Sequence, residues 1–263
     1  MPPDIWNHPA FAALTALFDP AALDRASGTP ALQRLMETVP WPVVNASGRR
    51  LRLVESGAVA AADYERSVDG EGVLKVHAAS WHDRFNACAW GLFPRTKAAI
   101  SARHARELEQ AGAGANGRTR VRDALTVFDE DGIVVAAADP LVEDAIRNFQ
   151  WTRLFVESRA VSRAKMLCVP IGHALMEKLR DPFVGLTAKA VFVPVDDAFF
   201  GLPWNEKLRH LDERCVARVD ELVTPRDLSP LPVLGIPGWW AANERHDFYD
   251  NREYFRSGRR GVR

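Results

Sequence analysis

The sequence predicts an α+β fold in which helices pack on a small, mainly antiparallel sheet. Amphipathic runs with apolar residues three or four positions apart are typical of helices, and short β-rich runs beside turn residues are typical of strands. Of the 263 residues, 47% are hydrophobic and 26% charged, which is enough apolar material for one large core. Since neither a repeat nor a linker is visible, we expect a single domain over residues 1–263.

Three parts of this domain differ in composition. Residues 1–42 are expected to form N-terminal helices, residues 43–224 an α+β core, and residues 225–263 a proline- and aromatic-rich tail that wraps the core. In the first part, an apolar stripe over residues 4–19 predicts one helix ended by Asp19-Pro20, and a second helix is expected over residues 31–39.

Strands and helices then alternate irregularly. The alternating run 51–55 predicts a strand, and the polar turn 67–72 before the apolar run 73–76 predicts a small hairpin. A helix over residues 81–92 ends at Phe93-Pro94, because the residue before a proline is disfavoured in helical space. The next helix is expected to run from Thr96, as its N-cap, to about Gln110.

The second half contains an acidic turn between two apolar runs. Runs 124–128 and 133–136 flank Asp129-Glu130-Asp131-Gly132, which predicts a β-hairpin whose first strand would carry Arg118, Arg120 and Arg122 on one face. The glycine-rich segment 111–117 is expected to be a flexible loop. It does not match a phosphate-binding loop, because no Gly-Lys-Ser/Thr follows it and no strand leads into it. Further expected elements are a helix over 140–149 capped by Asp139, a helix over 171–179, a strand over 187–194 and a helix over 205–223.

Charge and cysteine content exclude several classes of protein. Lys+Arg and Asp+Glu both number 34, so the net charge is zero and the whole molecule is not a polyanion binder. The three cysteines are too few and too scattered for a disulfide framework or a zinc knuckle. Neither a signal peptide nor a run of roughly 18 apolar residues is present, so we expect a cytoplasmic protein without a membrane span.

Chemistry-bearing residues concentrate between Ser80 and His104. His82 and Asn86 stand four residues apart and share one helix face. Arg95 and Lys97 flank the start of the following helix, where free amide groups and the helix dipole favour an anion. The stretch therefore predicts a polar pocket with an anion-attracting rim. A purely structural interpretation also exists, in which His82 and Asn86 form a hydrogen-bonded pair and the two cations are solvated.

Four motifs follow one another along the chain: His82-Asp83-x-Phe85-Asn86 with Trp90 and Phe93-Pro94-Arg95-Thr96-Lys97, Leu125-Thr126-x-Phe128-Asp129-Glu130-x-Gly132, Gly172-His173-Ala174-Leu175-x-Glu177, and Gly235-x-Pro237-Gly238-Trp239-Trp240-x-x-Asn243. They resemble a proteobacterial family known as domain of unknown function 3025, over about Val43 to Arg256. The resemblance implies no reaction and no cofactor. Larger aliphatic residues were expected at Cys88, Ala89 and Gly91, so helix packing here differs from the family pattern.

The first functional hypothesis is a metal-dependent hydrolase acting on a phosphate-containing or other anionic substrate. The motifs hold residue types that bind divalent metals: His82, Asp83, His104, Asp129, Glu130, His173 and Glu177. From these we expect a divalent metal ion to be bound by His82, His173, Glu177 and Asp129. The catalytic group would comprise His82, Asp83, Asn86 and His104, with Arg95, Lys97 and Arg120 binding substrate. The pair His82-Asp83 is similar to the dyad of HD-type phosphohydrolases, although their all-helical fold and ligand order differ.

Two alternatives stay open. In a metal-free enzyme, His82 would act as general base beside Asp83, with the cations holding an anionic substrate. In a non-catalytic module, the cations of residues 95–122 and the aromatic tail would bind an anionic small molecule, an RNA segment or a protein partner. The zero net charge weighs against RNA, and oligomeric state cannot be read from the chain.

Overall fold

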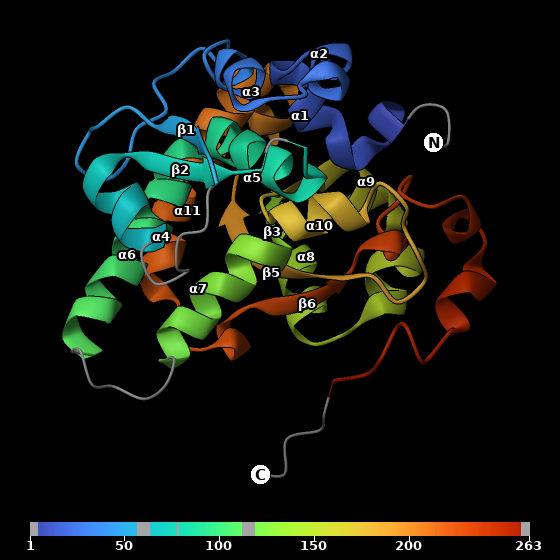
Figure 1. Ribbon diagram of the computed structural model, residues 1–263. Coiled ribbons are helices and arrows are strands. Elements are labelled where there is room, and N and C mark those ends of the chain that lie inside the picture. The colour runs from blue at the N-terminus through green and yellow to red at the C-terminus, as the bar shows by residue number, and fades with distance from the viewer. Residues whose placement is uncertain (1–4, 57–63, 78, 112–118, 259–263) are drawn as a thin grey trace.

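The computed structural model describes residues 5–56, 64–77, 79–111 and 119–258 (Figure 1). At its centre is a four-stranded sheet of order β4-β3-β5-β6. Strand β3 (Gly132–Ala137) pairs antiparallel with β4 (Met166–Pro170) and parallel with β5 (Thr187–Pro194), and β5 pairs antiparallel with β6 (Ser229–Pro232). Two of these three pairings are antiparallel, so the predicted α+β class with a small, mainly antiparallel sheet is confirmed.

A separate two-stranded sheet contains β1 (Arg52–Glu55) and β2 (Val73–Val76), which run parallel. Both strands were predicted, but the prediction that they form a hairpin is wrong, because they run parallel. A crossover precedes β2 and contains the short helix α4 (Tyr64–Arg66) and a π-helical turn (Ser67–Glu71). Parallel strands need such a crossover of about a dozen residues, whereas a hairpin turn reverses the chain.

The second predicted hairpin is also wrong, because residues 120–131 form helix α7 (Arg120–Asp131) instead of a strand and a turn. Ala124, Leu125 and Phe128 are all fully buried, as expected for one helix face. The Thr119 hydroxyl caps the helix by accepting the Arg122 N–H at 3.2 Å. A short apolar run fits either structure, and the acidic residues end a helix here. Arg120 and Arg122 are therefore helical, and Arg118 lies outside the described residues.

The remaining helices largely follow the expected pattern. They are α1 (Ala12–Leu17), α2 (Pro20–Arg25), α3 (Thr29–Met36), α5 (Trp81–Leu92), α6 (Pro94–Ala111), α8 (Pro140–Arg147), α9 (Arg159–Lys165), α10 (His173–Lys178) and α11 (Trp204–Glu221). Short 3-10 segments occupy Ile5–Asn7, Pro9–Phe11, Asp197–Gly201, Pro225–Asp227, Val233–Gly235, Ala241–Glu244 and His246–Asp250, and a π-helical turn occupies Arg153–Glu157.

The N-cap of one helix agrees with the expected elements, and the N-cap of another differs from them. Asp139 caps α8 as predicted, since its carboxylate accepts the Leu141 N–H at 2.9 Å. The expected single helix over residues 4–19 is instead a series of short helical pieces, and Asp19 caps the following helix α2 by accepting the Ala21 N–H at 3.0 Å. The glycine-rich segment lies outside the described residues, except for Ala111 at the end of α6.

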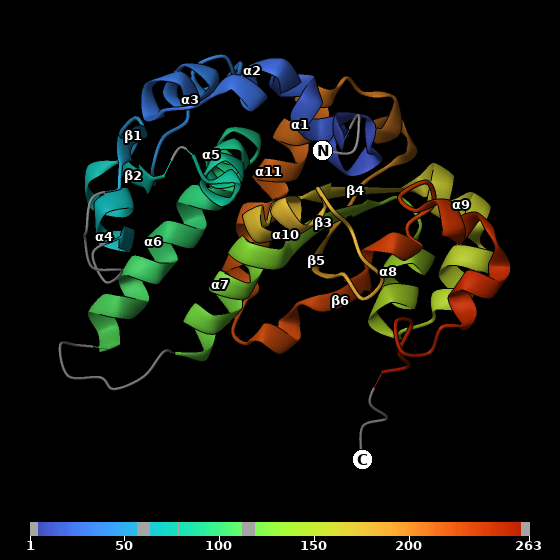
Figure 2. The ribbon, with the colours of Figure 1, turned by 45° about the vertical axis from the view of Figure 1, so that its right-hand side comes forward.

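The sheet lies between two groups of helices (Figure 2). Helices α7, α10 and α11 cover one side, and α8 lies with the C-terminal segment on the other. Helix α5 contacts α10, and α6 contacts α11 and α7. At Gly91 in α5, where a larger residue was expected, a Cβ would lie 2.5 Å from the Phe18 ring, so glycine permits the close approach of the N-terminal part.

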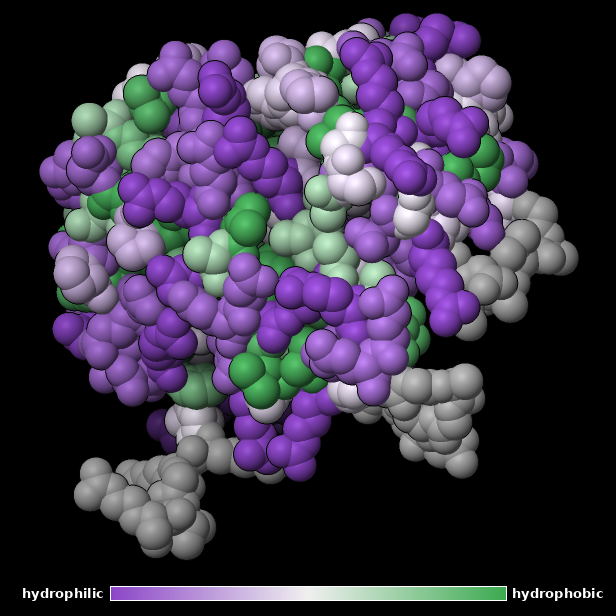
Figure 3. Space-filling view, turned by 90° about the vertical axis from the view of Figure 1, so that its left-hand side faces the viewer, coloured by the Kyte–Doolittle hydropathy of each residue, from purple (hydrophilic) through white to green (hydrophobic). Residues whose placement is uncertain are grey.

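One main hydrophobic core extends from Ala10 to Phe255 and includes the tail aromatics Trp239, Tyr249 and Tyr254. Tyr254 Oη donates to the Leu186 carbonyl at 2.8 Å, which attaches the tail to the start of β5. A smaller core lies under the two-stranded sheet. The face that carries this sheet is mainly hydrophilic, with hydrophobic residues in small separate patches (Figure 3). Among the described residues, no helix has both the length and the apolar composition needed to cross a membrane.

Candidate metal centre

Two glycines bring the end of α7 against the start of α10. The N–H groups of Ile171 and Gly172 both donate to the Gly132 carbonyl, at 3.1 and 2.9 Å. A Cβ on Gly172 would lie 2.4 Å from the Glu130 carbonyl oxygen and 2.4 Å from the Gly132 nitrogen, so no larger residue fits. This backbone contact places His173, the first residue of α10, beside Glu130.

His82, Glu130 and His173 form the centre of the site. One ligand atom from each lies within 4.8 Å of the other two. Glu130 Oε2 is 3.3 Å from His173 Nε2 and 3.9 Å from His82 Nε2. Ligand atoms on a metal with bonds of about 2.1 Å lie roughly 3–3.5 Å apart, so small side-chain shifts would bring all three onto one ion.

A second carboxylate stands behind each imidazole. Glu177 Oε2 lies 3.2 Å from His82 Nδ1, and Asp129 Oδ2 lies 3.8 Å from His173 Nδ1. His173 Nδ1 is buried and has no hydrogen-bond partner among the described residues. Metal-binding histidines commonly donate their second ring N–H to a carboxylate, which fixes the tautomer and the ring orientation. The two outer carboxylates match that role.

Lys97 anchors one of these outer carboxylates. Its Nζ donates to Asp129 Oδ1 at 2.5 Å and to Asn86 Oδ1 at 2.9 Å, and its side chain is only 3% exposed. Burial alone would raise the pKa of Asp129, but the Lys97 ammonium, together with His173 and His104, outweighs burial and lowers that pKa. Asp129 is therefore held as a carboxylate, oriented by Lys97 on one oxygen.

The two neighbouring carboxyl groups behave differently from one another. A hydrogen bond from His173 is the main reason why the pKa of Glu130 lies below its usual value. Burial, aided by the nearby charge of Asp129, raises the pKa of Glu65 to about 7. The Ser101 hydroxyl donates to Glu65 at 3.2 Å, beside a cavity of about 20 Å³ that Lys97 also lines. Nothing in the sequence singled out Glu65.

The centre is closed on one side and open on the other. The side chains of His82, Glu130 and Glu177 are 38, 37 and 44% exposed, whereas that of His173 is 6% exposed. The centre contains the carboxylates of Asp129, Glu130 and Glu177, and the buried Lys97 ammonium pairs with Asp129. Asp129 and Glu130 also lie at the negative end of the α7 dipole. This distribution favours a bound cation.

The structure brings together His82, Asp129, His173 and Glu177, which were the four predicted metal ligands. Glu130, one of the seven metal-binding candidates, occupies the third inner position, while Asp129 and Glu177 stand behind the histidines. In this arrangement the two outer carboxylates face the Nδ1 atoms of the histidines.

The other predicted catalytic residues lie farther out. The Asp83 carboxylate is bonded to His77 instead, whose N–H it accepts at 2.6 Å. Asn86 bonds Lys97, and His104, 3% exposed on α6, lies near enough to Asp129 to lower its pKa.

The predicted anion site at the start of the next helix is already filled by a side chain of the protein. Helix α6 begins at Pro94, so Thr96 is not its N-cap. Asp212 of α11 accepts the N–H groups of Arg95 and Thr96 at 3.0 and 2.9 Å, and the Thr96 hydroxyl at 2.7 Å. The Arg95 guanidinium pairs with Glu213 at 2.8 Å.

The three predicted substrate-binding cations do not form one group. Lys97 is buried against Asp129, Arg95 pairs with α11, and Arg120 begins α7, ten residues or about 15 Å along that helix from Glu130. Among the tail aromatics predicted to stack on bases, Trp239, Tyr249, Tyr254 and Phe255 are only 5–6% exposed, whereas Trp240 and Phe248 are partly exposed.

A family model described as "Protein of unknown function (DUF3025)" matches residues 51–259, a range that contains every residue of the centre. No curated protein and no solved structure matches the chain.

Proposed function

The chain belongs to the DUF3025 family of proteins of unknown function, and from the chemistry of its side chains we propose that it is a divalent-metal-dependent hydrolase. One observation carries the proposal. The Nε2 atoms of His82 and His173 converge on a single Glu130 oxygen, while each Nδ1 faces a further carboxylate. Metal-binding histidines direct one ring nitrogen at the ion and commonly the other at a carboxylate, and the arrangement here fits both features.

Two imidazoles and one carboxylate are a ligand set used by catalytic zinc sites, and it also suits iron(II). A divalent ion there would supply Lewis-acid activation of water. Asp129 would hold His173 with Nε2 free to bind, and Glu177 would do the same for His82. Glu177 is also the carboxylate best placed at the open side to accept a proton.

The substrate class is supported less directly. Because Arg95 and Lys97 are paired within the protein, a phosphate-containing or other anionic substrate would be held chiefly by the charge of the ion. The metal-free alternative loses its Asp83 partner, which bonds His77 instead. A cytoplasmic setting remains part of the proposal and is compatible with the three free, buried cysteines.

The test begins with metal analysis of untagged protein by mass spectrometry, followed by thermal unfolding in chelator and in added zinc, manganese or iron. His82→Ala and His173→Ala should remove the bound metal and the metal-dependent stabilisation. His77→Ala is the matched control, because His77 is exposed and pairs only with Asp83 among the described residues. Hydrolysis of p-nitrophenyl phosphates and carboxylate esters is then assayed with the metal that binds. If all three variants bind metal as the parent protein does, the proposed centre is wrong.

A further inference from the structure

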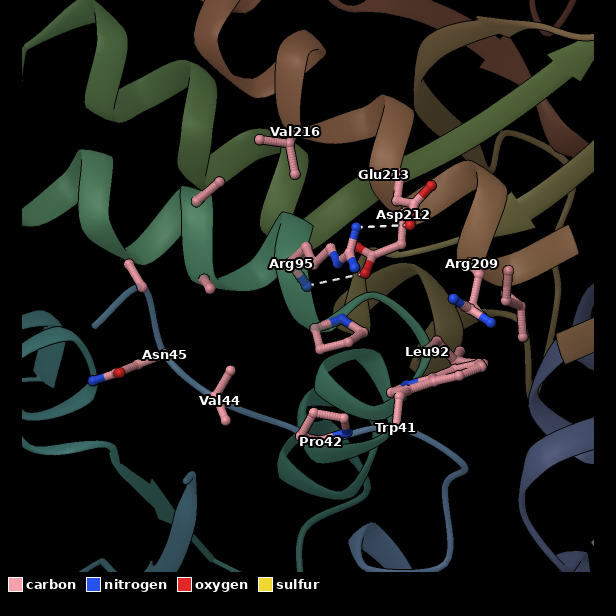
Figure 4. A pocket seen from close by; sticks show the side chains of 15 residues that line it. Trp41, Pro42, Val44, Asn45, Leu92, Arg95, Arg209, Asp212, Glu213 and Val216 are labelled. Carbon is pink, nitrogen blue, oxygen red and sulfur yellow. Dashed lines mark hydrogen bonds and ion pairs between the residues drawn. The ribbon is translucent and has the colours of Figure 1, made fainter. Parts of the chain in front are cut away.

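A second cavity, of about 500 Å³, lies between the segment 41–46, the start of α6 and the side of α11 that meets α6 (Figure 4). Its apolar lining includes Trp41, Leu92, Pro94, Ala98, Leu208 and Val216. Leu92 lies at the opposite end of α5 from His82, about 15 Å along the helix, so this cavity is separate from the candidate metal centre. Its volume falls within the roughly 300–1,000 Å³ of small-molecule sites.

The walls are held in place by contacts of their own. Trp41 Nε1 donates to the Gly91 carbonyl at 2.8 Å, which fixes the plane of the indole. Leu92 and Leu208 form a buried floor, at 1 and 0% exposure. On the loop, the Asn45 amide donates to the Val68 and Asp69 carbonyls at 3.1 and 2.7 Å, so the segment beside Trp41 is also fixed. The cavity is therefore largely preformed.

The charged groups of the lining are unequally matched. Asp212 is occupied by the start of α6, and Arg95 is paired with Glu213. Arg209 has no hydrogen-bond or ion-pair partner among the described residues, and its guanidinium extends toward Trp41 and Leu92 (Figure 4). An unmatched positive charge beside an aromatic, apolar surface is complementary to a molecule that has a flat apolar body and one negative group.

We propose that this cavity is a binding site for an amphipathic organic anion, with its flat apolar body against Trp41 and its carboxylate or sulfonate at Arg209. The proposal is independent of the metal centre, since the two sites share no residue. Either a substrate or an effector could have this combination of a flat apolar body and one negative group.

The probe is 8-anilinonaphthalene-1-sulfonate, a flat fluorescent anion, compared with uncharged N-phenyl-1-naphthylamine. Val216→Trp and Ala99→Met fill the cavity from α11 and α6 and should each abolish binding of both probes. Arg209→Gln should weaken the sulfonate by roughly two- to fivefold, the range for an exposed ion pair, and leave the neutral probe unchanged. Arg214→Gln, on the same helix outside the lining, is the matched control and should bind both probes normally.

Three results would overturn the proposal. Full binding in both folded cavity-filling variants would show that the probes bind elsewhere. Equal weakening by Arg209→Gln and Arg214→Gln would show a general charge effect. Equal loss of charged and neutral probes in Arg209→Gln would remove the preference for an anion. Circular dichroism and melting curves establish which variants are folded, and either filled variant alone is sufficient.

Discussion

His82 and His173 stand edge to face with ring centroids 4.4 Å apart, although 91 positions separate them in the chain. Each ring directs one nitrogen toward Glu130 and the other toward a different carboxylate. Two neutral imidazoles in this position can accept a cation between them, while two protonated rings would repel each other. A divalent ion that binds both rings would therefore have to displace any proton from their ligating nitrogens.

Glu130→Gln tests the inner carboxylate. The amide keeps the size of the side chain but removes its charge, so affinity for the divalent ion should fall by about 100-fold or more, beyond the roughly 10–100-fold typical of outer-shell changes. Thermal shift and calorimetric titration measure this loss. Exposed Glu253→Gln is the control, and equal affinities in the two variants would contradict the assignment of Glu130 as a ligand.

Gly172→Ala tests the contact between α7 and α10. The added methyl would collide with the Glu130 carbonyl, so we expect a loss of more than about 2 kcal/mol in unfolding free energy and a weaker metal site. Gly201→Ala is the control, because a Cβ there meets nothing within 4 Å. Urea denaturation compares the two, and a similar free energy of unfolding for both variants would argue against the close approach.

Lys97→Met tests the anchor of Asp129. Removal of the ammonium leaves a partly buried carboxylate without its cation, which should cost about 3–5 kcal/mol of stability and raise the pKa of Asp129. The double variant Lys97→Met, Asp129→Asn should recover part of that loss, because the stranded charge is gone. Denaturant titrations of the two single variants and the double variant complete the cycle. Purely additive effects would mean that the pair is not coupled.

Glu65→Gln tests the raised pKa beside the small cavity. The pKa of Glu65 rises from 4.5 to about 7 on folding, so below pH 4.5 the carboxyl is protonated in both states and carries no penalty. As the pH rises from 4.5 to 7, Glu65 releases its proton in the unfolded state before it does so in the native state. The free energy of unfolding of the parent protein therefore falls by roughly 2–3 kcal/mol relative to that of the variant. Denaturant titrations across this pH interval should therefore show the variant becoming more stable relative to the parent protein. Exposed Glu71→Gln should show no such gain, and parallel pH profiles for parent and Glu65→Gln would refute the shift.

The sequence identified the two histidines because their residue type and helical setting are informative without tertiary structure. It does not distinguish Glu130 from Asp129 as the inner carboxylate, because a hairpin over residues 124–132 puts both acidic residues in one turn, whereas they lie at the end of helix α7. The apolar spacing of Ala124, Leu125 and Phe128 fits a helix as well as a strand, and only packing against the sheet distinguishes them.

Other elements were missed for different physical reasons. Strand β6 contains two prolines in four residues, Pro230 and Pro232, and is stable only because it lies at the sheet edge beside β5. Burial raises the pKa of Glu65, and the charge of Asp129, which is distant in the chain, raises it further. The fold class depends on local patterns, whereas these features depend on which segments meet.

The carboxylate that completes the start of α6 belongs to Asp212, 116 residues after Thr96 in the chain. During synthesis the first amide groups of α6 must remain hydrated until α11 has left the ribosome. Docking of α11 on α6 is thus a late event that closes a very long loop, and such long-range closure slows folding. Nascent chains halted before residue 212 would lack this cap, so α6 acquires its native N-terminus only when most of the protein has been made.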